Sequence, residues 1–174
     1  TGDGVALISQ SGYVAYSVTN VERALPLGYV ISMGNQAVLN VADYIEAVLD
    51  EPRVRAIGLY LEGIVDIAAF SAAAMRAVKQ GVPLVALKAG GTQESAELAQ
   101  SHSGTLAVDN EIWSALFRRL AIVEAGSPKA LIETLKLLGS PKPPKGNRIV
   151  AAANSGGYAA MIGEKGRDAG LEFP

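Results

Sequence analysis

The sequence has no cysteine and only one histidine, His102. The absence of cysteine excludes a disulfide scaffold, a thiolate metal site and a thioester-forming nucleophile. A single histidine cannot build a metal site alone, so we predict none. With 15 basic and 17 acidic residues, the chain also lacks the basic excess typical of nucleic-acid binders, and we expect no nucleic-acid partner.

Long hydrophobic runs and targeting segments are also missing. The most apolar stretch, residues 56–75, is interrupted by Glu62, Gly63 and Asp66, which argues against a bilayer span. No signal or transit peptide is recognisable, so we expect no membrane partner and a cytoplasmic location. The chain does not begin with Met and its last thirty residues look incomplete. We therefore expect a piece of a longer polypeptide.

The remaining composition is rich in small apolar residues. Hydrophobic residues make up 49% of the 174 positions and charged residues 18%, which excludes a disordered or fibrous chain. Short apolar runs alternate with segments of helical period, as in βαβ units. Predicted strands cover residues 5–9, 29–33, 56–61, 82–87 and 121–124. Predicted helices cover 12–25, 40–50, 67–80 and 128–138. A further helix is predicted after Asp109, with Ile112, Leu116 and Leu120 on its buried side.

This order predicts an α/β fold, a flavodoxin-like doubly wound parallel sheet of five strands, over residues 1–140. Residues 141–146 are a proline-rich linker. Residues 147–174 then begin a second, similar domain with its first βα unit, a strand at 148–153 and a helix at about 157–169. Right-handed crossovers place every βα loop at one edge of such a sheet, so function should lie there.

Two βα turns at this edge share a pattern, an amide followed by Ser and Gly at the start of a helix. The first turn contains Gln10, Ser11 and Gly12, and the second contains Asn154, Ser155, Gly156 and Gly157. Small residues there allow an anion to approach backbone N–H groups at the positive end of the helix dipole, so each turn is a candidate phosphate site. Simple helix capping would also explain either turn.

Other loops at the edge add Gly34, Asn35, Glu62 and Lys88, with Gly34, Asn35 and Lys88 as candidate anion or substrate contacts. A carboxylate at the end of an apolar strand is costly to bury without a donor or cation, so Glu62 implies a partner unless it is a solvated loop residue. His102 lies in a hydroxyl-rich loop. Its imidazole could attack phosphorus while Glu62 holds the other ring N–H; the alternative is an exposed histidine without a role.

Five motifs in register resemble one family. They are Ile-Ser-Gln-Ser-Gly at 8–12, Ser-Met-Gly-Asn at 32–35, Leu-Tyr-Leu-Glu-Gly at 59–63, Leu-Lys-Ala-Gly at 87–90 and Ser-His-Ser-Gly-Thr-Leu-Ala at 101–107. In this order and spacing they resemble the NDP-forming acyl-CoA synthetases, which are relatives of the succinyl-CoA synthetase α subunit. The resemblance covers essentially the whole chain.

The resemblance implies that carboxylate, CoA and NTP are interconverted with acyl-CoA, NDP and phosphate through an acyl phosphate and a phosphohistidine. His102 would be the phosphorylated residue and Glu62 the carboxylate that orients it, while the two Ser-Gly turns would clasp the phosphoryl group. CoA and Mg-NTP or Mg-NDP would be bound mainly by CoA-binding and ATP-grasp domains, or a subunit, absent from this chain, which alone would be inactive. A homo-oligomer would be compatible with this interpretation.

The chain departs from the family pattern at four positions, Tyr13, Gly91, Val108 and Tyr158. The bulk of Tyr13 and Tyr158 beside the two phosphate turns would shrink the space for an anion. Gly91 stands where the family often has a basic residue, and the loss of that cation would weaken anion binding. Two alternatives stay open: a noncatalytic regulatory or scaffold module that senses CoA or an acyl phosphate, and an FMN-binding flavodoxin-like domain.

Overall fold

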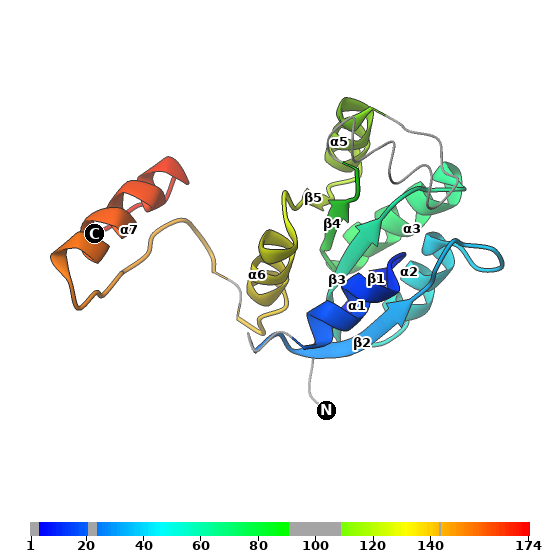
Figure 1. The fold of residues 1–174 in the computed structure, drawn as a ribbon, viewed down its shortest axis with the longest axis horizontal. Coiled ribbons are helices and arrows are strands. Elements are labelled where there is room, and N and C mark those ends of the chain that lie inside the picture. Colours follow the sequence, from blue (N-terminus) through cyan, green and yellow to red (C-terminus); the bar gives the residue numbers. More distant parts are fainter. Residues whose placement is uncertain (1–3, 21–23, 91–108, 143) are drawn as a thin grey trace. The chain divides into compact units, whose positions relative to one another are not determined.

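A computed structural model describes residues 4–20, 24–90, 109–142 and 144–174 (Figure 1). Contacts divide the chain into two compact units, Thr1–Pro141 and Lys142–Pro174. The first unit contains a five-stranded sheet in the order β2-β1-β3-β4-β5, and every neighbouring pair is parallel. The strands are β1 (Gly4–Ser9), β2 (Leu27–Ser32), β3 (Val54–Leu61), β4 (Leu84–Lys88) and β5 (Val123–Glu124). This confirms the predicted doubly wound parallel sheet.

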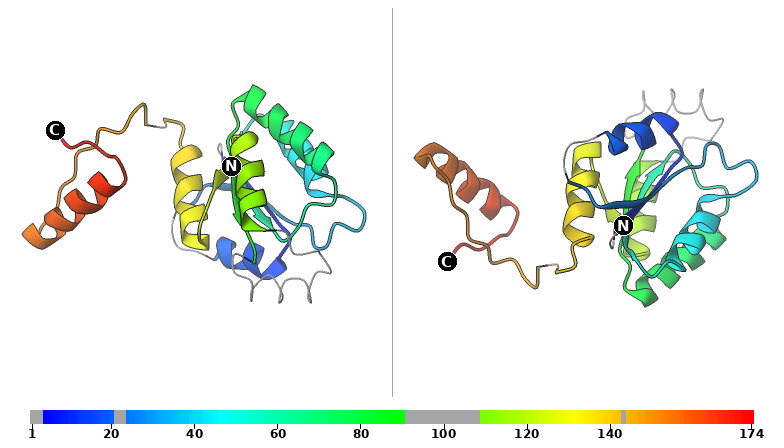
Figure 2. Two further views of the ribbon diagram at one scale, coloured as in Figure 1. Left: turned by 90° about the horizontal axis from the view of Figure 1, so that it is seen from above. Right: turned by 90° about the horizontal axis from the view of Figure 1, so that it is seen from below.

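Helices cover both faces of the sheet, as Figure 2 shows. The helices are α1 (Gly12–Thr19), α2 (Val41–Leu49), α3 (Ile67–Gln80), α5 (Asn110–Arg119), α6 (Pro128–Leu138) and, in the second unit, α7 (Gly156–Asp168). Residues of α2, α3 and α5 enter one buried cluster, and residues of α1 and α6 enter the other. The first unit is therefore a three-layer α/β/α sandwich.

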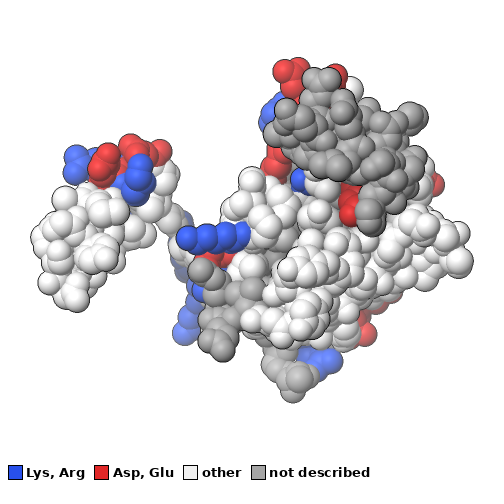
Figure 3. All heavy atoms as spheres, in the orientation of Figure 1, with Lys and Arg blue, Asp and Glu red and all other residues white. Residues whose placement is uncertain are grey.

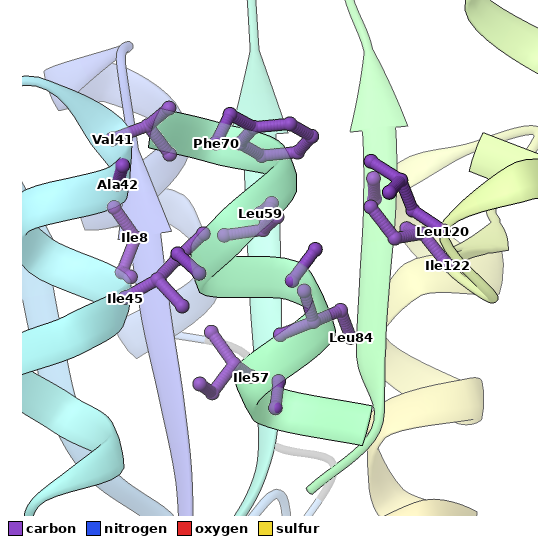
Figure 4. Close-up of a cluster of buried hydrophobic side chains, with 14 of the residues drawn as sticks. Ile8, Val41, Ala42, Ile45, Ile57, Leu59, Phe70, Leu84, Leu120 and Ile122 are labelled. Carbon is purple, nitrogen blue, oxygen red and sulfur yellow. The ribbon is translucent and has the colours of Figure 1, made fainter. Parts of the chain in front are cut away.

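The two cores follow from the alternation of side chains along the central strands. In β1, Ala6 and Ile8 face the cluster under α2 and α3, whereas Val5 and Leu7 face the cluster under α6. All four are fully buried. Successive side chains of a strand point to opposite faces of the sheet. A strand that is covered on both faces therefore needs apolar residues at every position, and its sequence is a continuous hydrophobic run. Figure 4 shows the first cluster, which includes Ile8, Ile57, Leu59 and Phe70.

The ends of several elements differ from the sequence prediction. Helix α1 ends at Thr19, with Asn20 as its C-cap, instead of running to residue 25. Strand β5 has only two residues, both exposed. Two of the three residues predicted on the buried side of α5 lie there: Leu120, its C-cap, is buried, and Leu116 is partly buried against the core. Ile112 is 60% exposed, so this part of the prediction was wrong, and Trp113 and Phe117 are buried. Trp113, Phe117 and Leu120 lie four and three positions apart, on one face of the helix, and Ile112 lies one position away from that face.

The second unit has a helix where the sequence predicts one, but not the strand. Residues 148–153 form no strand; only an isolated bridge joins Arg148 to Glu172. Within the described residues of this unit no further strand is present to pair with this segment, and a lone strand is not stable. The prediction of a strand at 148–153 is therefore wrong; apart from the bridge at Arg148, this segment has no regular secondary structure. Of the helices in the described ranges, none has the length and apolar character needed to span a bilayer.

Candidate functional site

The parallel register brings the carboxyl ends of four strands to one edge. Ser9 at the end of β1 is paired with Ser32 of β2 and with Tyr60 of β3, and Leu61 of β3 is paired with Lys88 of β4. The chain leaves β1 for β2 on one side and later enters β3 on the other side. Loops after β1 and β3 therefore diverge from a topological switch point, the usual ligand crevice of open α/β sheets.

The turn after β1 is held by its own serines. Ser9 is fully buried, and its hydroxyl donates to the Ser11 carbonyl at 2.7 Å while accepting from the Ser11 N–H at 3.1 Å. The Ser11 hydroxyl caps α1 by accepting from the N–H of Val14 at 3.3 Å. Tyr13 is 79% exposed and points its bulk into solvent. Helix capping, the alternative explanation for this turn, is thus present.

Gln10 links this turn to the end of β3. Its side chain is buried, and its Nε2 donates to the Gly63 carbonyl at 2.7 Å. Its Oε1 accepts from the N–H of Gly63 at 2.9 Å and from the N–H of Glu62. The predicted residues Gln10 and Glu62 are therefore brought together across the switch point.

Gln36, which is not among the predicted site residues, joins the same cluster. Its Nε2 donates to the Gly63 carbonyl at 3.0 Å, and its Oε1 accepts from the N–H of Val41 at 3.2 Å. Its backbone has φ +62°, in the left-handed region. The predicted contacts Gly34, at φ +64°, and Asn35 are exposed just before it. The only sequence signal for Gln36 is its position in the loop after β2, next to Gly34 and Asn35.

Glu62 is half-buried at the first position after β3. Burial raises the pKa of the neighbouring Tyr60 hydroxyl, and the Glu62 carboxylate adds to this rise. In the described ranges, no hydrogen bond or ion pair of the Glu62 carboxylate is found. Of the two interpretations of Glu62, a partnered carboxylate and a solvated one, the described residues supply no donor for the first.

Lys88 is held at the start of α5. Its Nζ donates to Oδ1 of Asn110 at 2.8 Å and to the Gly90 carbonyl at 3.3 Å. The ammonium also lies 5.6 Å from the centroid of the Trp113 ring, within the range of a cation–π contact. Burial lowers the pKa of Lys88, although Glu124 and Asp109 oppose this change.

Part of the predicted site lies outside the described residues. This is the case for His102 with the rest of its motif at 101–107, and for Gly91 and Val108. The second turn belongs to the other unit. Ser155 occupies the N-cap of α7 in extended conformation without a side-chain capping bond, and residues 154–157 are exposed. Tyr158 is 62% exposed.

Charge and metal-binding groups are dispersed. The face of the molecule in Figure 3 shows acidic and basic side chains interspersed among uncharged ones. Over the described ranges, no group of three or more His, Cys, Asp or Glu residues could hold a metal ion. The described groups at the edge of the sheet are amides, hydroxyls, the Glu62 carboxylate and the Lys88 ammonium.

The comparison with protein families agrees with this architecture. Residues 2–138 match the model of the succinyl-CoA ligase-like flavodoxin domain. The chain belongs to this family. Its matched region contains the sheet, the first Ser-Gly turn, Glu62 and Lys88. The resemblance found in the sequence motifs is confirmed.

Relatives of this succinyl-CoA ligase-like domain include two ADP-forming acetate–CoA ligases. The α subunit of ligase I from Pyrococcus furiosus is 31% identical over 171 residues, which cover 97% of this chain and 37% of that subunit. The ligase of Methanocaldococcus jannaschii is 31% identical over 163 residues, which cover 92% of this chain and 23% of that protein. The chain thus spans well under half the length of these relatives.

Solved structures lead to the same group of enzymes. Acetyl-coenzyme A synthetase 1 of Candidatus Korarchaeum cryptofilum, determined with phosphate and ADP, superposes with a TM-score of 0.85 at 29% identity. The superposition covers 99% of this chain and 38% of that synthetase. The succinyl-CoA ligase-like domain is therefore similar in fold to a part of an acyl-CoA synthetase.

Proposed function

We propose that this chain is part of an NDP-forming acid–thiol ligase. The complete enzyme would convert a carboxylate, CoA and NTP into acyl-CoA, NDP and phosphate, in either direction, in the cytoplasm. The match to ADP-forming acetate–CoA ligases over nearly the whole chain supports this proposal. CoA and the Mg-nucleotide would be held mainly by other parts of the enzyme, because the chain spans 37% or less of these relatives.

The division of the chain is part of the same proposal. Residues 1–140 would form the first succinyl-CoA ligase-like flavodoxin domain, residues 141–146 a linker, and residues 147–174 the start of a second such domain. The family match ends at residue 138, and contacts separate two units at Pro141, which supports a boundary there.

In the proposed reaction, His102 carries the phosphoryl group. One nitrogen of its neutral imidazole attacks phosphorus, the bond from phosphorus to the leaving carboxylate or NDP oxygen breaks, and that oxygen keeps the electron pair. The imidazole becomes cationic as the bond forms. Glu62 would accept a hydrogen bond from the other ring N–H, which fixes the tautomer and stabilises this charge.

The phosphoryl group needs donors as well as a nucleophile. We assign this role to the α1 N-terminus at Ser11 and Gly12, and separately to residues 154–157 at the start of α7. Backbone N–H groups and the positive end of a helix dipole stabilise phosphate there without a metal of their own. Gly34, Asn35 and Lys88 would contribute further anion or substrate contacts at the edge of the sheet.

The observation that carries the proposal is the hydrogen-bonded link between the first Ser-Gly turn and Glu62. Gln10, adjacent to Ser11, binds the backbone of Glu62 and Gly63 at the switch point. A carboxylate that orients a phosphorylated histidine has to lie beside the group that binds its phosphate. This link supports a shared role for the turn and Glu62.

A labelling experiment tests the proposal. The complete ligase is incubated with γ-³²P-labelled NTP, or with acyl-CoA and labelled phosphate, and acid-labile, base-stable label is mapped. We expect label on His102, none in His102→Ala, and much slower labelling in Glu62→Gln with unchanged folding. Glu164→Gln, an exposed substitution on α7, serves as the control. Label retained in His102→Ala would refute the assignment, and an unlabelled enzyme would favour the noncatalytic module.

A further inference from the structure

We propose that Gln10 and Gln36 are positioning residues whose side-chain amides clamp the Glu62–Gly63 turn and thereby set the direction of Glu62. This inference rests on the proposed role of Glu62. It also reassigns Gln10, which the sequence analysis placed among the phosphate-binding residues. Neither residue has to touch substrate for this role.

The hydrogen bonds of Gln10 are matched to one dipeptide. A buried primary amide is costly unless its donor and acceptor are satisfied. Here Oε1 receives two backbone N–H groups, from Glu62 and Gly63, and Nε2 donates to the carbonyl of the same Gly63. Two donors facing one end and a carbonyl facing the other also define which end of the amide is oxygen. The polar end of this side chain is thus directed to the turn after β3.

The backbone N–H of Gln10 has a partner as well. It donates to the carbonyl of Tyr60 at 3.1 Å, continuing the β1–β3 ladder one residue beyond the strand. A phosphate that approached Gln10 would have to compete with these internal hydrogen bonds. The Ser11 N–H is likewise bound, to the Ser9 hydroxyl at 3.1 Å. At this turn we therefore assign the phosphate contact to the Ser11 hydroxyl and to Gly12 at the helix start.

Gln36 clamps the turn from the other side. A non-glycine residue at φ +62° is uncommon and strained unless its surroundings hold it there. Two side-chain bonds provide this support, one to the Gly63 carbonyl and one from the N–H of Val41 at the start of α2. The Gly63 carbonyl therefore accepts from two glutamines that belong to the loops after β1 and β2.

The result is a rigid junction of three loops around one carboxylate. Glu62 has its own N–H bound to Gln10, and the following residue, Gly63, is held on both its N–H and its C=O. The backbone on which the Glu62 side chain is mounted is therefore restrained directly before and after its Cα. A catalytic carboxylate gains from such restraint, because small displacements of an orienting group reduce rates strongly.

A double-mutant cycle in the complete ligase tests the clamp. Gln10→Met keeps the volume and removes all side-chain hydrogen bonds, and Gln36→Gly removes the second amide while accommodating the positive φ. We expect each to slow the labelling of His102, Gln10→Met by between about 10-fold and 100-fold. In the Glu62→Gln background the same substitutions should have little further effect. Gln80→Ala, an exposed glutamine at the end of α3, is the matched control.

Hydrogen exchange provides the second measurement. The amides of Glu62 and Gly63 should be protected in the unsubstituted protein and should exchange faster in Gln10→Met, with little change across β3. If Gln10→Met reduces labelling by the same factor in the unsubstituted ligase and in the Glu62→Gln variant, Gln10 acts independently of Glu62 and the inference is wrong. Unchanged exchange at Glu62 and Gly63 would also overturn it.

These results separate the clamp from the proposed function. If the unsubstituted ligase carries no label on His102, the proposed function fails, and hydrogen exchange alone then decides whether the clamp exists. If Gln10→Met does not fold, Gln36→Gly provides the same cycle. Normal labelling in a folded Gln36→Gly, with normal exchange at Gly63, would contradict the part assigned to Gln36.

Discussion

Leu135 of α6 packs directly on the backbone of Gly58 in β3. A Cβ added at Gly58 would lie 2.5 Å from Cδ1 of Leu135, which is fully buried. The helix can therefore approach the central strand this closely only because position 58 has no side chain. The contact lies in the core formed by β1, β3 and α6, away from the carboxyl edge of the sheet.

We expect Gly58→Ala to destabilise the first unit. Because Leu135 is fully buried and Cδ1 of Leu7 is 3.3 Å from the same point, the added methyl overpacks the core, at a cost of about 1–3 kcal/mol. Urea unfolding of this variant should show a lower midpoint. Gly126→Ala, where an added Cβ meets nothing within 4 Å, is the control. Equal stability of both variants would contradict the close packing.

The reverse change on the helix should create a cavity. Leu135→Ala removes a fully buried side chain between α6 and the sheet and should cost about 2–5 kcal/mol of unfolding free energy. Leu137→Ala, on the same helix but 52% exposed, should cost much less. Thermal or urea unfolding of the two variants measures the difference, and similar losses would argue against the assigned buried face of α6.

The capping box at the start of α2 should contribute measurably to stability. The Asn40 side chain accepts from the N–H of Ala42 at 2.8 Å, and the Asp43 carboxylate accepts from the N–H of Asn40 at 2.7 Å. We expect Asn40→Ala to lower the free energy of unfolding by about 1 kcal/mol, and Asn40→Ser to restore most of it. Circular dichroism during urea unfolding would show this; an unchanged Asn40→Ala would refute the role of the cap.

Tyr60 should make stability depend on pH in the alkaline range. Burial, and secondarily the Glu62 carboxylate, raise its pKa in the folded state above the ordinary value of 10.0. The folded chain then keeps a proton that the unfolded chain loses, so the free energy of unfolding falls as pH rises through 10 towards the folded pKa. Tyr60→Phe should reduce this fall, as measured by urea unfolding between pH 8 and 11. A slope identical to that of the unsubstituted chain would contradict the prediction.

The sequence predicted much of the fold because local patterns were strong. Strand β3 is an almost unbroken apolar run, and α3 begins at a capping Asp66 and ends at Gly81 with φ +70°. Predictions failed where a neighbour decides the outcome. Residues 148–153 have the composition of a strand but no described strand to pair with, and Ile112 is turned outward because Trp113 and Phe117 occupy the interior.

In the candidate site, too, some residues could be predicted from the sequence and others could not. Gln10, Ser11 and Glu62 could be selected from strand ends and helix starts, and the roles of His102 and the phosphate turns stay predictions. The pairing of the Gln10 amide with the backbone of residues 62–63, 53 positions away in the case of Gly63, could not be derived from spacing. Gln36 had no local signature beyond its loop.

In the first unit, the sequence by itself determined the order of strands and helices and which end of each strand faces the shared edge, because hydrophobic periodicity and parallel crossovers follow general rules. Only the tertiary structure decided which side chains meet at that edge. The order β2-β1-β3 makes the loops after β1, β2 and β3 neighbours, and buried amides then have to find hydrogen-bond partners among whatever groups lie within reach.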